Sequence, residues 1–121
     1  MRTQGVIYDK SKAFAIEVIA LCNKLRDNGE YVMSKQVLKS GTSIGANYCE
    51  ALGAESSSDF IHKLSISLKE ANETYFWLDI LHTSGYMDDY LFETMTTHLE
   101  EIYKMINSAS ITVKKRNNIK Q

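Results

Sequence analysis

The 121-residue chain contains no proline, only two cysteines and no long hydrophobic run. Because proline breaks helix interiors, its absence permits long uninterrupted helices. Cys22 and Cys49 both fall within helical patterns, so we expect two buried, reduced thiols in a reducing compartment. No apolar stretch approaches the roughly 20 residues that a bilayer-spanning helix needs. Residues 1–12 lack the apolar segment of a signal peptide. We therefore expect a cytoplasmic protein that does not associate with membranes.

The chain also lacks a strong net charge, with 14 basic and 15 acidic residues giving a formal charge of −1. No global field therefore draws it to nucleic acid or to an anionic membrane. The one concentrated basic segment is the tail at 114–121, with Lys114, Lys115, Arg116 and Lys120. We interpret it as a solubilising tail whose lysines favour a helix C-terminus. The alternative is a weak, salt-sensitive contact with RNA or DNA phosphates.

The composition that remains is typical of one globular domain, with 44% hydrophobic and 24% charged residues. A chain of this length can fold without metal or disulfide staples. Apolar residues spaced by three and four predict four helices, at about 9–28, 32–52, 58–84 and 88–113. Short connections make consecutive helices antiparallel. The sequence therefore predicts an all-α, antiparallel up-down-up-down four-helix bundle over residues 1–121, with a tail that frays from residue 114.

Two of these segments carry more specific packing signals. Gly41 and Gly45 are four residues apart within 32–52, so they share a face and permit close approach of another helix. The segment 58–84 carries a heptad-like seam, formed by Ile61, Leu64, Leu68, Ala71, Tyr75, Leu78 and His82. Further apolar residues lie outside the expected seams, including Phe76, Trp77, Leu81 and Tyr103. We predict that these four form an exposed surface that a second subunit covers, so the chain should self-associate.

The histidines do not form a convincing metal site. Asp59 with His62, and Asp79 with His82, match the acid-x-x-His pairs of di-iron bundles, but both pairs lie in one predicted helix. A separation of 20 residues in a helix corresponds to about 30 Å, so the pairs cannot share a metal within one chain. No strand-turn-helix context supports a nucleophilic serine. The sequence therefore predicts a protein that is not an enzyme and that has no catalytic residues, metal or cofactor.

Four polar residues are the most conspicuous candidates for a functional role, namely Asn47, Glu50, Asn72 and Glu73. Together with Glu70, they could belong to an ordinary solvated face with salt bridges. Alternatively, they form a hydrogen-bonded polar layer, either inside the bundle or between subunits, because buried acids need partners.

Two motifs resemble signatures of the bacterial four helix bundle protein family, also called the 23S ribosomal RNA intervening-sequence protein (S23-like) family. The first is Ser43-Ile44-Gly45-Ala46-Asn47-Tyr48-Cys49-Glu50-Ala51, which is similar to S-I-x-x-N-x-x-E-(G/A). The second comprises Ser58-Asp59-Phe60-Ile61-His62-Lys63-Leu64, Leu68-Lys69-Glu70-Ala71-Asn72-Glu73-Thr74 and Trp77-Leu78. The resemblance extends from about Phe14 to Ala109, which is most of the chain.

The resemblance implies an antiparallel four-helix bundle, commonly assembled as a ring-shaped homopentamer. It assigns family positions to Asn47, Glu50, Asn72 and Glu73, for which we expect a role in packing or in subunit contacts. A related group, the accessory variability determinant of diversity-generating retroelements, binds a reverse transcriptase and nucleic acid through a strongly basic ring surface. The present chain departs from that group in its slightly negative charge.

Three functional hypotheses follow from the sequence, of which the third is an enzyme or metal protein that uses the cluster of glutamate and asparagine residues. The first is a non-enzymatic homo-oligomeric bundle that acts as a scaffold or interaction module, with itself and a protein encoded nearby as partners. The second is a nucleic-acid-binding accessory protein, of the ribosomal RNA intervening-sequence or retroelement type, which uses the basic tail.

Overall fold

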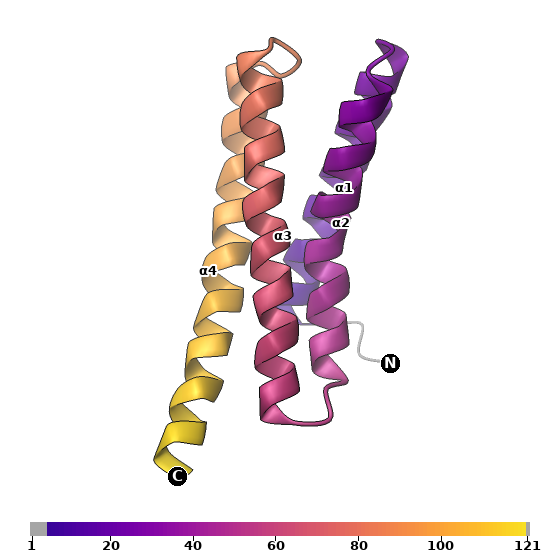
Figure 1. The fold of residues 1–121 in the computed structure, drawn as a ribbon. Coiled ribbons are helices and arrows are strands. Elements are labelled where there is room, and N and C mark those ends of the chain that lie inside the picture. Colours follow the sequence, from indigo (N-terminus) through magenta and orange to yellow (C-terminus); the bar gives the residue numbers. More distant parts are fainter. Residues whose placement is uncertain (1–4, 121) are drawn as a thin grey trace.

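The computed structural model describes residues 5–120, and the side chains of residues 5–118. Within that range the chain forms an all-helical bundle without strands (Figure 1). Its elements are α1 (Val6–Asp27), α2 (Tyr31–Leu52), α3 (Ser57–Thr83) and α4 (Asp89–Lys120). Successive helices run in opposite directions, so the predicted up-down-up-down four-helix bundle is confirmed.

Helix α4 is longer than the sequence pattern indicated. It continues to Lys120 rather than ending near residue 113. Fraying of the basic tail from residue 114 stays a prediction. Neither glycine nor proline interrupts the helix sequence. The cations at its C-terminal end are also favoured by the helix dipole. The basic residues of the tail are therefore held along a continuous helix.

Local signals explain where the helices begin and end. Ser56 caps α3, because its hydroxyl accepts a hydrogen bond of 3.0 Å from the Asp59 backbone amide. Asp88 does the same for α4, with its carboxylate accepting from the Leu91 amide at 2.8 Å. Gly29 and Gly85 follow α1 and α3 with φ of 78° and 85°, a conformation that glycine adopts at low cost.

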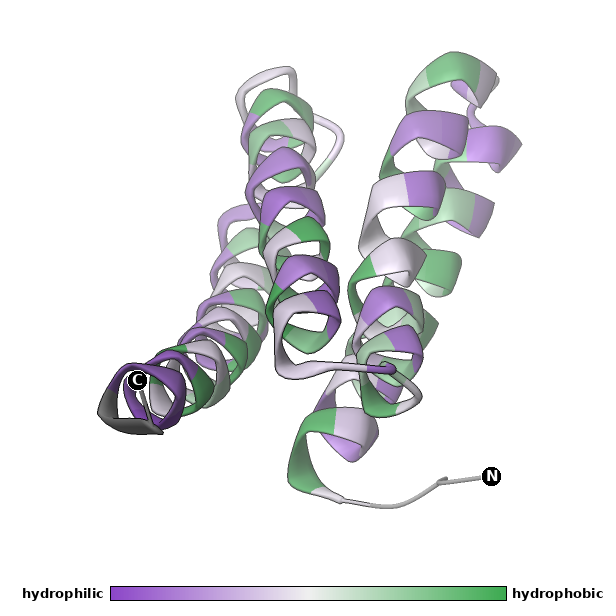
Figure 2. Ribbon diagram, turned by 60° about the horizontal axis from the view of Figure 1, so that its bottom comes forward, coloured by the Kyte–Doolittle hydropathy of each residue, from purple (hydrophilic) through white to green (hydrophobic). Residues whose placement is uncertain are grey.

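The helices form a four-sided arrangement in which α1 packs against α2 and α4, and α3 also packs against α2 and α4. The α1–α2 pair and the α3–α4 pair therefore form opposite sides of the bundle (Figure 1). Hydrophobic residues recur along every helix among hydrophilic ones (Figure 2). Those turned inward form one core, whose largest fully buried side chains include Phe14, Leu25, Ile44, Leu64, Leu78, Leu81, Met95, Ile102 and Ile106.

Small residues bring α1 and α2 close together. A Cβ atom placed on Gly41 would lie 2.8 Å from a methyl group of Val18, and one on Gly45 would lie 3.0 Å from the Cβ of Ser11. The close approach predicted from the spacing of these two glycines is therefore present. At the other end of the contact, the Cys22 thiol donates to the Ser34 carbonyl at 3.3 Å, and the Ser34 hydroxyl donates to the Cys22 carbonyl at 3.3 Å.

The α2–α3 contact depends on buried hydroxyl groups. Ser67 donates to the Ile44 carbonyl at 2.7 Å, and the Thr74 and Ser40 hydroxyl groups lie 2.9 Å apart. The buried stripe of α3 is Leu64, Ser67, Ala71, Thr74, Leu78 and Leu81. The predicted seam was thus rotated: it included Tyr75 and His82, whereas the structure buries Thr74 and Leu81 in their place. A pattern of apolar residues alone misses small hydroxyl residues that satisfy their hydrogen bonds locally.

The two cysteines differ in exposure, which corrects the expectation that both are buried. Cys22 is 3% exposed, whereas Cys49 is exposed. Burial raises the pKa of the Cys22 thiol, against smaller opposing effects of the Ser34 hydrogen bond and the Arg26 charge. Since the thiolate is the reactive species, both burial and the raised pKa protect Cys22.

We therefore predict that a thiol reagent such as 5,5′-dithiobis(2-nitrobenzoate) modifies one thiol rapidly in the native protein and the second only after unfolding in urea. Cys49→Ser should abolish the rapid phase, and Cys22→Ser should leave it intact. Rapid modification of both thiols in the native protein would contradict the described burial of Cys22.

We also predict that Gly41→Ala lowers the free energy of unfolding by about 1–3 kcal/mol, because the new Cβ meets Val18 in a tightly packed helix contact. Val18→Ala alone leaves a cavity, but in combination with Gly41→Ala it provides room for the added methyl group. Urea titrations of both single variants and the double variant should show a double loss smaller than the sum of the single losses. If the two losses in free energy of unfolding were strictly additive, the methyl group added at position 41 would not be in conflict with the Val18 side chain.

Candidate functional site

The four polar positions that the sequence singled out lie on different parts of α2 and α3. Asn47 is half-buried, and its side-chain amide donates to the Ser43 carbonyl one turn earlier at 2.8 Å. Glu50 is exposed and forms a loose ion pair with Lys63 on α3, with Oε1 and Nζ 3.9 Å apart. Asn72 and Glu73 are exposed on α3. Within one chain these residues do not form a buried polar layer; a role between subunits stays a prediction.

Among the acidic residues of this region, Glu70 has a shifted pKa. Partial burial raises the pKa of its carboxyl group, and the neighbouring Glu73 charge adds to that rise. Lys39 on α2 acts in the opposite direction. The α2–α3 side therefore carries charges of both signs, from Glu70 and Glu73 on α3 and Lys39 on α2.

The aromatic positions predicted as an oligomer surface fall into two groups. Phe76 is 55% exposed, and its ring centroid lies 5.3 Å from that of the half-buried Trp77. Tyr103 is half-buried and lines a groove of about 240 Å³ between α3 and α4. Leu81 was assigned to this surface wrongly, because it is fully buried in the core. Its position in the rotated stripe of α3 explains the error.

A chain of aromatic contacts extends this α3–α4 groove. The Phe92 ring on α4 stacks on His82, with centroids 4.2 Å apart, and meets the edge of Tyr75 at 6.3 Å. The Nε2 atom of His82 lies 2.7 Å from a carboxylate oxygen of Asp89 on α4. His82 thus pairs with Asp89 rather than with Asp79, the partner suggested by spacing in the sequence.

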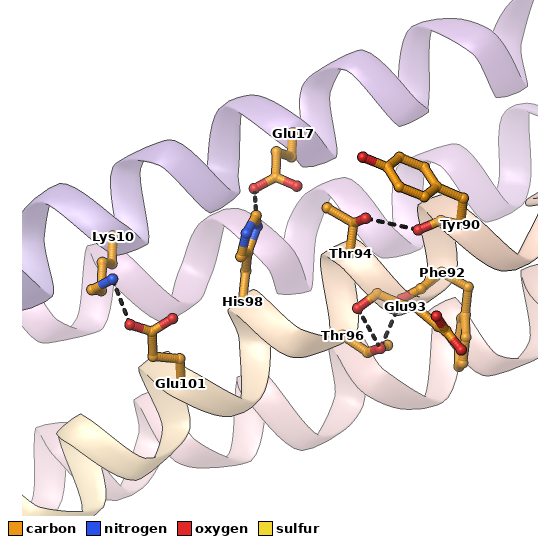
Figure 3. Close-up of polar contacts among 9 residues, drawn as sticks. All are labelled: Lys10, Glu17, Tyr90, Phe92, Glu93, Thr94, Thr96, His98 and Glu101. Atoms are coloured by element: carbon orange, nitrogen blue, oxygen red, sulfur yellow. Dashed lines mark hydrogen bonds and ion pairs between the residues drawn. The ribbon is translucent and has the colours of Figure 1, made fainter.

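Polar pairs connect α1 to α4 (Figure 3). The Lys10 ammonium lies 2.5 Å from a Glu101 oxygen, and His98 Nδ1 lies 2.6 Å from a Glu17 oxygen. The Lys10 hydrogen bond and charge hold the pKa of the Glu101 carboxyl group below its usual range. Sequence reasoning missed these pairs because their members are far apart in the chain; nothing in the local spacing connects them.

The basic residues Lys114, Lys115 and Arg116 are exposed near the end of α4. The side chain of Lys120 lies outside the described residues. Next to Lys114 is a polar hollow that is also lined by Ser58, Ile61, Asn117 and Asn118. Lys114 therefore lies beside the start of α3, at a different place from the α3–α4 aromatic groove.

Metal centres and membrane-spanning helices are two further kinds of site that a helical bundle can carry. Among residues 5–118, no group of three or more histidine, cysteine or acidic side chains is arranged to hold a metal ion. None of the helices described there is both long and apolar enough to cross a bilayer. The remaining candidates are surfaces: the aromatic groove between α3 and α4, the basic end of α4, and a small-residue groove between α1 and α2, whose lining includes Ser11, Ala15, Thr42, Gly45 and Ala46. Grooves lined mainly by apolar groups bind partners by excluding water from both surfaces.

Comparison with known proteins agrees with this architecture. The chain is similar to a protein of unknown function from the S23 ribosomal protein family of Bacteroides thetaiotaomicron, whose crystal structure is known. The two sequences are 46% identical, and the two structures superpose with a TM-score of 0.85. The similarity covers 87% of the present chain and 98% of that protein. None of the functionally curated proteins matches significantly. The profile of the family described as 23S rRNA-intervening sequence protein matches residues 3–108. The chain therefore belongs to the 23S rRNA-intervening sequence protein family.

Proposed function

We propose that this protein is a non-enzymatic scaffold that acts by associating with further copies of itself and presenting the assembled surface to a partner. The observation that carries this proposal is the set of large apolar side chains left exposed on the bundle. They include Ile16, Ile19, Leu38, Tyr75, Phe76 and Tyr90. Where exposed apolar side chains gather into a patch, the patch is characteristic of a surface that another protein covers.

The burial pattern supports assembly over an intramolecular role for these residues. The core is already filled by other side chains, so the exposed residues cannot be recruited to it without displacing well-packed neighbours. The ring-shaped homopentamer implied by the family resemblance is the specific form of this proposal. A cytoplasmic location is also part of it, since Cys22 and Cys49 are both free.

Size-exclusion chromatography with light scattering tests the proposal directly. We expect a mass that is a multiple of 13.8 kDa, and five times that value for the pentamer. Because the association is driven by apolar surface, it should persist at high salt. A monomer at concentrations well above 10 µM would contradict the proposed self-association.

A nucleic-acid-binding role is the second candidate, favoured by the continuation of α4 as a helix through Lys114, Lys115 and Arg116. A helix holds these cations at fixed separations, and an oligomer would multiply their number on one particle. Contacts of this kind bind phosphates without sequence preference. The family name points to ribosomal RNA genes, which makes RNA the first ligand to test.

For this second candidate we predict binding to RNA that weakens as salt rises, measured by fluorescence anisotropy from 50 to 300 mM salt. Replacing Lys114 and Lys115 by alanine should reduce the slope of log K against log salt by about 0.7–0.9 for each phosphate that the variant no longer neutralises. Replacing the exposed Lys24 and Lys69 by alanine serves as the charge-matched control. Absence of binding at 50 mM salt, or equal effects of both pairs, would reject the tail as an RNA-binding segment.

A further inference from the structure

The groove between α1 and α2 contains a free thiol that the proposed function does not use. The groove has a volume of about 170 Å³ and is lined by Tyr8, Ser11, Lys12, Ala15, Thr42, Gly45, Ala46 and Cys49. Cys49 is free and exposed, so reagents in solution reach its sulfur atom. An exposed thiol reacts with many reagents, and preference for one class of partner requires further groups in the groove.

A close contact between the helices fixes where the thiol lies along the groove. Gly45 of α2 lies against Ser11 of α1, since a Cβ atom on Gly45 would be 3.0 Å from the Cβ of Ser11. Cys49 follows Gly45 by one turn of α2. Because the helices run in opposite directions (Figure 1), Cys49 lies about one turn, or roughly 5 Å, before the level of Ser11 along α1. A group attached to the Cys49 sulfur and directed along the groove therefore passes over Ser11.

Ser11 supplies a polar group that has no partner within the described residues. It is 4% exposed, and its hydroxyl group forms no hydrogen bond there. Hydroxyl groups in helix interiors commonly bond to a carbonyl one turn earlier, as those of Thr42 and Ser43 do here. A buried hydroxyl without a partner is unfavourable. Since Ser11 lines the groove, a polar group bound in the groove would satisfy it.

The charge of this groove comes from Lys12. It is exposed and carries the one formal charge among the residues that line the groove. Asp9 and Glu50 adjoin groove residues in the chain, but neither lines the groove, and Glu50 pairs instead with Lys63 on α3. The rest of the lining consists mostly of small side chains. The groove therefore favours a small anionic group over a cationic one.

We propose that Cys49 forms a reversible mixed disulfide with a small peptide thiol that carries carboxylate groups. The Cys49 thiolate attacks one sulfur atom of the disulfide of that peptide. A new S–S bond joins Cys49 to one half, the original S–S bond breaks, and the other half leaves as a thiolate that takes up the proton lost by Cys49. Cys49 is thereby oxidised and the released half is reduced. An excess of the free peptide thiol reverses the exchange.

The attached peptide has a partner in the groove for each of its polar parts. Its backbone lies over Ser11, whose hydroxyl group can donate to a carbonyl or accept from an amide. Its carboxylate lies near the Lys12 ammonium group, where an exposed ion pair adds a modest preference. Ala46 leaves room for the peptide because its side chain is small. This inference does not depend on self-association of the chain.

The test uses the full chain, with oxidised and reduced glutathione as the probe. Intact-mass spectrometry after acid quenching gives the equilibrium constant for exchange at Cys49. The reference thiol is Ala20→Cys in a Cys49→Ser background, since Ala20 is exposed on α1 and does not line the groove. Cys22 is buried and should stay unmodified in both proteins. We expect the constant for Cys49 to exceed that of the reference thiol by about 3- to 50-fold, from one hydrogen bond and one exposed ion pair.

Two single substitutions separate the two contacts. Ser11→Ala removes the hydroxyl group and should lower the constant for Cys49 about 2- to 10-fold. Lys12→Gln should lower it about 2- to 5-fold for oxidised glutathione and leave exchange with the neutral bis(hydroxyethyl) disulfide unchanged. Neither substitution should alter the constant of the reference thiol at position 20. Circular dichroism should show the same helix content for every variant.

Equal constants for Cys49 and the reference thiol would overturn the proposal and leave Cys49 an ordinary exposed cysteine. It would also be overturned if Ser11→Ala caused no loss, or if Lys12→Gln lowered exchange with the charged and the neutral disulfide equally. A disulfide between the Cys49 residues of two copies, formed in preference to the mixed disulfide, would contradict it as well. If Ser11→Ala lost helix content, the reference thiol and Lys12→Gln would still decide, because they change exposed residues. These readouts are separate from the mass measurement that tests self-association.

Discussion

The close approach of α2 to its two neighbours is the constraint on which the rest of this bundle depends. On one side, Gly41 leaves no room for a side chain beside Val18. On the other, Ser67 and Thr74 are buried and form hydrogen bonds to α2. Glycine and small hydroxyl residues reduce the separation between helices, and the hydroxyl groups avoid the free-energy penalty of burial by bonding locally. The position of α2 then determines which sides of α1 and α3 face outward.

This constraint accounts for the distribution of the large side chains. Small residues occupy much of the α2 contact, so Leu64, Leu78 and Leu81 fill the centre of the bundle while Tyr75 and Phe76 lie outside it. Aromatic and aliphatic groups on the outside of a bundle gain free energy when another molecule removes them from water. The packing inside one chain and the surfaces available for assembly are therefore two results of the same arrangement.

The candidate surfaces could be anticipated only in part. Phe76 and Tyr103 were identified because they fall outside the expected seams, and Phe76 is indeed exposed. Leu81 was misplaced because the periodicity counted apolar residues and passed over Ser67 and Thr74. The α1–α2 groove was missed as a surface because its distinguishing feature is small side chains, which the sequence indicates as packing sites without showing which side remains open.

The sequence by itself determined the number, order and approximate bounds of the helices, since helical periodicity and end signals act over a few residues. It also indicated the close contact at Gly41 and Gly45. Its two signature motifs indicated the family to which the chain belongs. Only the tertiary structure decided the rotation of α3, the pairing of His82 with Asp89 and the contact of His98 with Glu17. These depend on the mutual orientation of helices that are distant in the chain, which short-range spacing does not specify. The physical reason is that a helix can turn one stripe or its neighbour inward at similar cost until its partners are in place.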